Sequence, residues 1–372
     1  MSDRQPSNLL ILGASTRAAA FSALRAGITP VCGDLFADAD LCRVCQATAV
    51  ASYPDGLEQI SQASPPGPWM YTGALENHPS LVDRLAATRC LYGNSGETLR
   101  KVRNPFLVRE VLQAAGFHLP DCRASAVGLP TDGSWLRKRL RSAGGLHVGR
   151  WHGANSEEVV RGSCYFQHFI AGMSCAAVYV SVGGQAQLLG VTEQLLADEF
   201  RYTGSVGPLR LNELRRAELE RLGSTLANSF SLVGVWGVDF VWSDDGLWPI
   251  EINPRYTASM EIIERACGPS IVGLHIAACR DRTLPNAWPQ PGSNFRWHGK
   301  QVVYAESDIE ISPAHAARLE ALNEGRSYAA VADLPVAGTS IRRGHPVCTV
   351  FAVADTRTKL MTLLKHRTEE SL

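Results

Sequence analysis

The sequence predicts a mixed fold, with an N-terminal α/β domain on a parallel sheet, an α+β core and a small β-rich C-terminal part. Three observations support this prediction. Strand-like and helix-like segments alternate up to about residue 100, short strands with glycine turns begin after residue 120, and proline- and glycine-bounded strands follow residue 285. Because 372 residues exceed the usual size of one hydrophobic core, we expect domains over 1–100, 101–284 and 285–372.

The N-terminal segment has the pattern of a βαβ unit. A strand over 8–12 is followed by the turn Gly13-Ala14-Ser15-Thr16, an alanine-rich helix that ends at Gly27, and a second strand over 30–35. Two strands joined through a helix lie parallel. A helix-like stretch at 81–91 continues the α/β pattern.

The middle of the chain changes from helices to strands. A helix over 105–115 is stopped by Gly116 and Pro120. Apolar segments joined by glycine turns then predict an antiparallel sheet. These segments are 135–138, 165–170, 176–182 and 187–191.

A long amphipathic helix over 211–232 precedes a β-hairpin. The hairpin strands span 237–242 and 248–252, and the turn Ser243-Asp244-Asp245-Gly246 joins them. Short strands such as 301–305 and 347–352 predict the β-rich C-terminal part.

Charge and composition exclude several classes of partner. Lys plus Arg and Asp plus Glu number 36 each, so no overall field would attract nucleic acid or anionic lipid. The apolar run 9–12 is too short for a signal-peptide core or a membrane span. We therefore expect a cytoplasmic protein that binds neither nucleic acid nor membrane.

The ten cysteines are scattered along the chain, which favours buried free thiols such as Cys164, Cys175 and Cys279 over disulfides. Cys42 and Cys45 form a lone C-x-x-C pair. A metal or redox role for this pair is the less favoured interpretation, because no second pair follows at zinc-like spacing.

The strongest functional signal lies in the hairpin. Side chains alternate along a strand, so Glu251 and Asn253 share one face, and Asp239 can lie opposite them on the partner strand. Two carboxylates and an amide oxygen suit Mg²⁺, which shares carboxylates with substrate phosphates. The alternative is a solvated hairpin face, but a carboxylate between Ile250 and Ile252 is costly unless it is paired or metal-bound.

Two further elements carry weaker signals. Lys138 ends an apolar strand before Ser142, Ala143, Gly144 and Gly145, whose backbone N–H groups can surround phosphate oxygens; a hairpin turn with solubilising basic residues explains it equally well. The segment with Gln167, Phe169 and Ile170 can bind an adenine edge and pack on its face. Taken alone, that segment is better explained as a core strand.

In this order the three elements resemble the ATP-grasp superfamily over about residues 95 to 265. Lys138 with 142–145 resembles the family's strand lysine and glycine-rich loop, although Arg139 stands where a proline often follows that lysine. Gln167, Phe169 and Ile170 resemble the adenine hinge, with Gln167 where many members have an acidic residue. The remaining matches are Asp239, Glu251 and Asn253 to the metal triad and Arg255 to the arginine after it.

The resemblance implies a two-lobed ATP site, two Mg²⁺ ions, with Mn²⁺ as an alternative, and an N-terminal domain that supplies part of the acceptor site. A small-molecule carboxylate would become an acyl phosphate and an amine would attack it, with Lys138 and Arg255 as catalytic residues. An earlier lysine of the family contacts the α-phosphate, and here Lys101 or Arg103 must serve. A homodimer is compatible with this assignment.

A finer resemblance is to ATP-grasp proteins found with tetrahydromethanopterin and methanofuran one-carbon genes. It rests on 251–264, on Tyr202-Thr203-Gly204-Ser205 and on the segments 332–335 and 346–350. It implies the addition of an amino acid such as glutamate to a one-carbon coenzyme precursor.

Two other functional classes remain open. One is a nucleotide-binding sensor or subunit without turnover. The other is a nicotinamide-dependent oxidoreductase, which the first βαβ unit allows. The G-x-G-x-x-G fingerprint is absent, however, because Ser15 and Ala18 occupy glycine positions.

Overall fold

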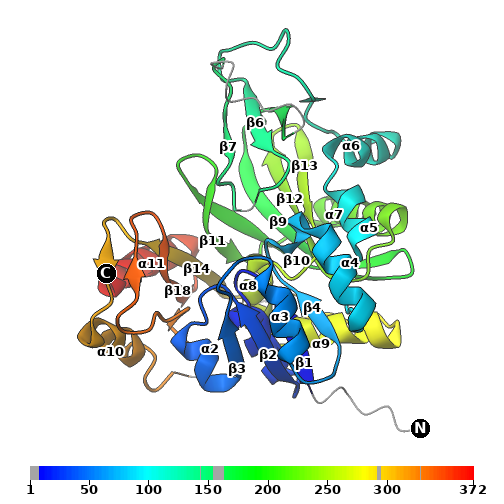
Figure 1. Ribbon diagram of the computed structural model, residues 1–372. Helices are drawn as coiled ribbons and strands as arrows, with labels where there is room; N and C mark the ends of the chain where they lie inside the picture. The colour runs from blue at the N-terminus through cyan, green and yellow to red at the C-terminus, as the bar shows by residue number, and fades with distance from the viewer. Residues whose placement is uncertain (1–7, 143, 154–162, 291–294, 327) are drawn as a thin grey trace.

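A computed structural model describes residues 8–142, 144–153, 163–290, 295–326 and 328–372. Within these ranges the strands form a four-stranded parallel sheet, an eight-stranded sheet, a second four-stranded sheet and a two-stranded sheet. The N-terminal domain and the C-terminal elements lie side by side in the lower half of Figure 1, and a lobe with β6 and β7 projects above them.

The predicted N-terminal βαβ unit is confirmed. The parallel sheet has the order β3-β2-β1-β4, and α1 (Arg17–Arg25) joins its first two strands. The strands are β1 (Asn8–Leu12), β2 (Thr29–Asp34), β3 (Gln46–Ala49) and β4 (Trp69–Tyr71), and the other helices are α2 (Ala39–Val44), α3 (Gly56–Ala63), η1 (Leu75–Asn77) and α4 (Pro79–Thr88). Parallel strands end at one edge, so the loops after β1 and β4 meet there.

The projecting lobe is a small antiparallel sheet with the order β5-β8-β6-β7, and Trp135, Trp151 and Phe166 form its core. Its strands are β5 (Cys122–Arg123), β6 (Trp135–Arg139), β7 (Val148–Arg150) and β8 (Cys164–His168). The helices α5 (Gly96–Val102) and α6 (Pro105–Ala114) precede it.

The eight-stranded sheet has the order β13-β12-β9-β10-β11-β14-β18-β16 and connects the other parts. Tyr179 and Trp236 of this sheet form one core with Leu222 and Leu226 of α7 (Glu213–Phe230). Val178 and Val180 point to a second core with α1 and α8 (Ala258–Cys267). Its central strands are β9 (Met173–Val182), β10 (Gln185–Ala197), β11 (Arg201–Gly207), β12 (Gly234–Ser243) and β13 (Gly246–Asn253).

The C-terminal part continues this sheet, because β14 (Trp297–Tyr304) pairs with β11 across residue 285. The domain boundary at 285 stays a prediction. The expected β-rich composition was incomplete, since α10 (Pro313–Ala321) and α11 (Arg357–Ser371) contribute as much as the strands. The remaining strands are β15 (Ile309–Glu310), β16 (Val331–Ala332), β17 (Ser340–Ile341) and β18 (Pro346–Ala354).

The helix α11 was missed because its buried side is narrow. Only Leu360, Leu364 and Ser371 are buried among its fifteen residues, so no apolar stripe can be read from the sequence. Leu360 and Leu364 pack against Gly299 of β14, where a Cβ would lie 2.9 Å from Leu360 Cδ2. A glycine on the strand thus lets the helix approach closely.

In the described part of the chain, no single helix is long and apolar enough to cross a membrane; only the bent pair Ala258–Cys267 and Ile271–Asp281, with an angle of 109°, reaches that length and composition together. This second segment contains α9 (Ile271–Ile276) and η2 (Ala277–Asp281). All ten cysteines are free thiols. Cys42 and Cys45 are not joined, and Cys45 Sγ instead lies 3.8 Å from Cys32 Sγ.

Candidate functional site

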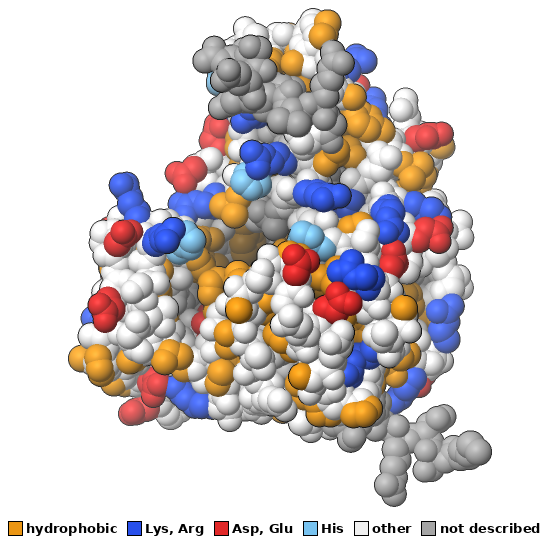
Figure 2. Space-filling view, viewed as in Figure 1, with side chains coloured by type: hydrophobic (Ala, Val, Ile, Leu, Met, Phe, Trp, Pro, Cys, Tyr) orange, Lys and Arg blue, Asp and Glu red, His pale blue; other side chains and the backbone are white. Residues whose placement is uncertain are grey.

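A cavity of about 640 Å³ lies between the small lobe, the eight-stranded sheet and the N-terminal domain. Figure 2 shows the surface hollowed between the upper lobe and the lower half, with Lys and Arg side chains around the hollow. Every predicted site residue that the structure describes lines this cavity, while Ala143 lies outside the described residues. These residues are Arg103, Lys138, Ser142, Gly144, Gly145, Gln167, Phe169, Ile170, Asp239, Glu251, Asn253 and Arg255.

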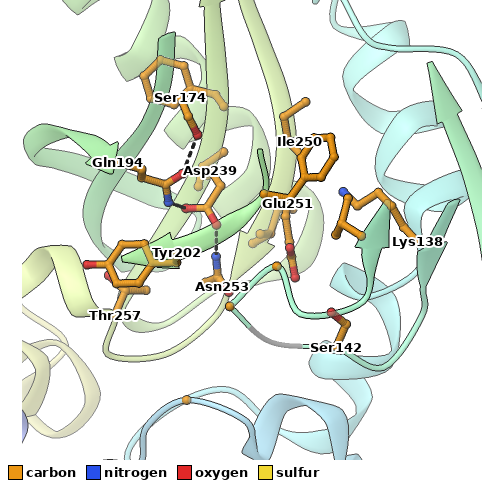
Figure 3. A pocket seen from close by; sticks show the side chains of 18 of the residues that line it. Lys138, Ser142, Ser174, Gln194, Tyr202, Asp239, Ile250, Glu251, Asn253 and Thr257 are labelled. Atoms are coloured by element: carbon orange, nitrogen blue, oxygen red, sulfur yellow. Dashed lines mark hydrogen bonds between the residues drawn. The ribbon is translucent and has the colours of Figure 1, made fainter. Parts of the chain in front are cut away.

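The hairpin brings the three predicted metal ligands together. Asp239 of β12 pairs directly with Glu251 of β13, and Gly237 pairs with Asn253. Asn253 Nδ2 donates to Asp239 Oδ2 at 3.0 Å, and Gln194 Nε2 donates to Asp239 Oδ1 at 2.9 Å. Figure 3 shows Glu251 between this pair and the side chains of Lys138 and Ser142.

The two carboxyl groups have opposite electrostatic environments. Burial, and then the nearby Glu251 carboxylate, raises the pKa of Asp239 to about 7. Burial also acts to raise the pKa of Glu251, but the positive charges of Arg103 and Lys138 outweigh it and leave that pKa below its ordinary value. Glu251 is thus held ionised, while Asp239 titrates near neutrality.

The residues fit a magnesium site that a phosphate ligand would complete. Two carboxylates and an amide oxygen are hard oxygen ligands, which Mg²⁺ prefers. Among the described residues, no group of three or more His, Cys, Asp or Glu side chains is placed to hold a metal ion. Asp239, Glu251 and Asn253 would supply only part of the Mg²⁺ coordination shell, which Mg²⁺ commonly completes with water and substrate phosphates.

Lys138 approaches this group from the small lobe. It lies on β6 opposite Tyr165 of β8, and its Nζ donates to Gln167 Oε1 at 3.1 Å. Burial acts to lower its pKa, but the interactions with Tyr165 and Glu251 raise it above the ordinary value. Lys138 is therefore a buried ammonium group beside the carboxylates.

Arg103, at the end of α5, faces the same carboxylates. Its Nη1 donates to Glu251 Oε1, and its Nη2 donates to Asn77 Oδ1 at 3.1 Å and to the Ser142 carbonyl at 3.2 Å. Lys101 instead pairs with Glu97 on the outer surface, at 2.7 Å, and is half exposed. Of the two basic residues considered from the sequence, the structure brings only Arg103 to the cavity.

Arg255 is held from the N-terminal domain. Its Nε and Nη2 both donate to Glu76 Oε1, at 2.9 and 2.6 Å, and Nη2 also donates to Asn253 Oδ1 at 3.0 Å. Glu76 follows β4, at the edge where the parallel strands end. The side chain of Arg255 is 13% exposed and lines the cavity, so its position is fixed by two domains.

The glycine loop and the predicted adenine segment line the cavity on the small-lobe side. A Cβ on Gly145 would lie 1.9 Å from the Phe200 carbonyl oxygen, and its φ of +76° also favours glycine. Phe169 and Ile170 lie just beyond the end of β8, where we had expected the strand to continue. The Arg150 guanidinium lies 4.0 Å from the centre of the Phe169 ring, a cation–π contact.

A buried ionic network closes the cavity at the N-terminal domain. Arg17 donates to Glu261 Oε1 at 2.6 Å and to Asp333 Oδ1 at 2.8 Å, and Lys300 Nζ donates to Glu261 Oε2 at 3.2 Å. Arg17, Lys300 and Asp333 line the cavity. With Glu261 of α8 they come from four parts of the chain, so the network joins four segments.

Several of these residues could not be found from the sequence. Gln194, Glu76 and Asn77 carry no motif, and each reaches its partner only through the fold. One general rule could have found Glu76 and Asn77: the residues that follow parallel strands lie at one edge of the sheet, and both residues follow β4.

A family model matches the middle of the chain. Residues 102–259 match the family model described as an ATP-grasp domain. That range begins one residue before Arg103 and ends after Arg255, so it contains all the predicted site residues.

Two curated proteins match the chain at low identity. The uncharacterized protein y4rH of Sinorhizobium fredii is 22% identical over 340 residues, which cover 80% of this chain and 66% of that protein. The uncharacterized protein MJ0776 of Methanocaldococcus jannaschii is 22% identical over 197 residues, covering 53% and 42%. The chain thus spans slightly less than two thirds of one relative and less than half of the other.

Solved structures match nearly the whole chain. The L-amino acid ligase from Bacillus licheniformis has a TM-score of 0.72 at 14% identity and covers 99% of this chain and 98% of its own. The N5-carboxyaminoimidazole ribonucleotide synthetase from Thermotoga maritima has a TM-score of 0.68 at 16% identity and covers 98% of both chains. At these identities the likeness is one of fold.

Proposed function

Because this chain belongs to the ATP-grasp superfamily, with its ATP-grasp domain at residues 102–259, we propose that it is an ATP-dependent carboxylate–amine ligase that works through an acyl phosphate. One observation carries the proposal. Two carboxyl side chains and three cations, on elements from both sides of the cavity, line it together. These residues are Asp239, Glu251, Arg103, Lys138 and Arg255.

The positive groups have complementary tasks in such a reaction. Lys138 and Arg103 hold phosphate oxygens of ATP, and the Lys138 ammonium offsets charge on the γ-phosphoryl group as it transfers to the substrate carboxylate. Arg255 holds the acyl phosphate through the second N–H of its Nη1, whose first N–H donates to the Tyr256 carbonyl, while the amine attacks the carbonyl carbon and inorganic phosphate leaves. Mg²⁺ held by Asp239, Glu251 and Asn253 would supply charge neutralisation at the phosphates.

We place the substrates at the N-terminal side of the cavity. Arg17 and Lys300 are 3% and 5% exposed and line the cavity. Both pair with Glu261, and such positive side chains at a cavity wall can also donate hydrogen bonds to an anionic group of a substrate. An amino acid such as glutamate, added to a one-carbon coenzyme precursor, meets that requirement, and we propose it as the substrate class, with the cytoplasm as the site of action.

The oxidoreductase alternative is disfavoured by the loop after β1. Thr16 donates to Asp34 Oδ2 through its backbone N–H at 2.6 Å and through its hydroxyl at 2.8 Å. The carboxylate of Asp34 therefore occupies the start of α1, where a dinucleotide-binding unit would place a pyrophosphate.

ADP release in the presence of paired carboxylates and amines tests the proposal. The panel contains amino acids together with methanofuran and pterin precursors, and the control omits the amine. A ligase releases ADP and inorganic phosphate only with a matched pair. Tight ATP binding with no ADP release for any pair would instead favour a nucleotide-binding sensor.

A further inference from the structure

We propose that Arg103 is an exchangeable counterion: it pairs with Glu251 in the free protein and moves to the nucleotide phosphates when ATP binds. A divalent cation would then bind Glu251 together with ATP rather than before it. The inference deepens the proposed function and rests on its nucleotide site. It concerns the order in which the cation and the nucleotide bind.

The first step is competition for one oxygen atom. Arg103 Nη1 donates to Glu251 Oε1, and Arg103 is 13% exposed. A divalent cation on Oε1 would lie against the guanidinium, and two positive charges in a partly buried site repel strongly. Cation binding at Glu251 Oε1 therefore requires that Arg103 move away.

The second step concerns the two terminal nitrogens of Arg103, of which Nη2 is held by the protein around it and Nη1 contacts Glu251. Its Nη2 is held by Asn77 Oδ1 at 3.1 Å and by the carbonyl oxygens of Ser142 at 3.2 Å and Leu140 at 3.5 Å. Nη1 has Glu251 as its partner. Rotation about Nη2 can carry Nη1 from the Glu251 carboxylate to a phosphate oxygen. The charge-assisted hydrogen bond to phosphate is as strong as the one to the carboxylate.

The third step concerns the other ligand atoms. Both oxygens of Asp239 accept hydrogen bonds, from Gln194 and Asn253, and the amide oxygen of Asn253 accepts one from Arg255. Protein donors thus already bind both carboxylate oxygens of Asp239 and the amide oxygen of Asn253. Phosphate oxygens supply the missing ligands and also bind Arg103 in place of Glu251. Nucleotide binding therefore both completes the coordination of the cation and releases the carboxylate.

The test measures Mn²⁺ binding by calorimetry without nucleotide, and binding of a non-hydrolysable ATP analogue in excess EDTA. In Arg103→Met the competing charge is gone, so Mn²⁺ should bind about tenfold or more tighter than in the wild type. The analogue should bind about tenfold or more weaker, because a phosphate ligand is lost. The two affinities move in opposite directions.

Lys101→Met is the matched control, because Lys101 lies on the same helix and pairs with Glu97 on the surface. It should change neither affinity. Arg103→Gln removes the charge but keeps a donor for the Ser142 carbonyl, and it replaces Arg103→Met if that variant does not fold.

Unchanged or weaker Mn²⁺ binding in Arg103→Met and Arg103→Gln would overturn the exchange. So would an unchanged affinity for the ATP analogue. Failure of the ligase proposal looks different, since the opposite shifts would persist while no carboxylate and amine pair gave ADP release. The two proposals therefore fail independently.

Discussion

Glu76 Oε1 accepts hydrogen bonds from both Nε and Nη2 of Arg255, at 2.9 and 2.6 Å, although the two residues are 179 positions apart in sequence. The N-terminal domain therefore sets the orientation of the arginine to which we assign the acyl phosphate. Glu76 is 1% exposed and lines the cavity beside Arg255, and its Oε1 holds the guanidinium of Arg255 in place.

Glu76→Gln should lower kcat by about tenfold or more while the KM for ATP stays unchanged, because a neutral amide holds the guanidinium less firmly. Steady-state ADP release gives both constants. Glu58→Gln, in an exposed pair with Arg84, is the control and should behave as the wild type. A rise in the KM for ATP at unchanged kcat would contradict the assigned role.

Lys138→Met should weaken ATP binding or turnover by about tenfold, or about 1.4 kcal/mol, because a positioned ammonium group is removed from the cavity. Arg137, the preceding residue of β6, points to the other face of the strand. Arg137→Met should therefore have little effect in the same calorimetric titration with an ATP analogue. Equal losses in the two variants would mean that general positive charge serves the nucleotide.

Glu251→Gln should reduce turnover by orders of magnitude at unchanged circular dichroism, because the variant removes a charged ligand and keeps the shape of the side chain. The hairpin pairing of Glu251 with Asp239 uses backbone groups and should persist. Wild-type turnover in Glu251→Gln would refute the metal assignment.

Metal-dependent nucleotide binding should strengthen as the pH rises through about 7, the pKa to which burial and then Glu251 raise Asp239. Below that pKa the carboxyl group is protonated and is a poor ligand, so each pH unit should cost up to about tenfold in affinity. Titration of the Mn²⁺–nucleotide complex from pH 6 to 8 measures this slope. Asp245→Asn, on the exposed hairpin turn, should keep the slope, whereas a flat wild-type profile would exclude Asp239 as a ligand.

Glu261→Gln should destabilise the fold by about 3 kcal/mol, because it leaves Arg17 and Lys300 buried without their shared carboxylate. The free energy of unfolding in urea measures the loss. Glu369→Gln, in an exposed pair with Lys365, should stay within about 0.5 kcal/mol of the wild type. A loss below about 1 kcal/mol in Glu261→Gln would show that the network contributes little.

The parts of the site that the sequence predicted are those in which chemistry follows local pattern. Asp239 and Glu251 lie on two strands joined by a tight turn, so alternation and turn position were enough to bring them opposite each other. Lys138 is likewise adjacent to its loop. The ATP-grasp fold was predicted from the order of these local elements and is confirmed.

The parts that could not be predicted depend on long-range pairing. Arg103 donates a hydrogen bond to Asn77, and Arg17 donates one to Asp333, which is 316 residues away in sequence. No local periodicity of the sequence predicts these contacts. The ion pairs also depend on which face of each element is buried, which is settled only when the domains pack. The helix at 357–371 was missed for a related reason, since its stability comes from packing on β14 and β18.

Transfer of isotope from the substrate tests the central claim most directly. For a carboxylate that supports ADP release, the carboxyl oxygens are labelled with oxygen-18 and the products are analysed by mass spectrometry. Attack of the carboxylate on the γ-phosphorus predicts ADP and inorganic phosphate that carries one labelled oxygen. Unlabelled phosphate, or AMP that carries the labelled oxygen together with unlabelled pyrophosphate, would contradict the acyl-phosphate mechanism.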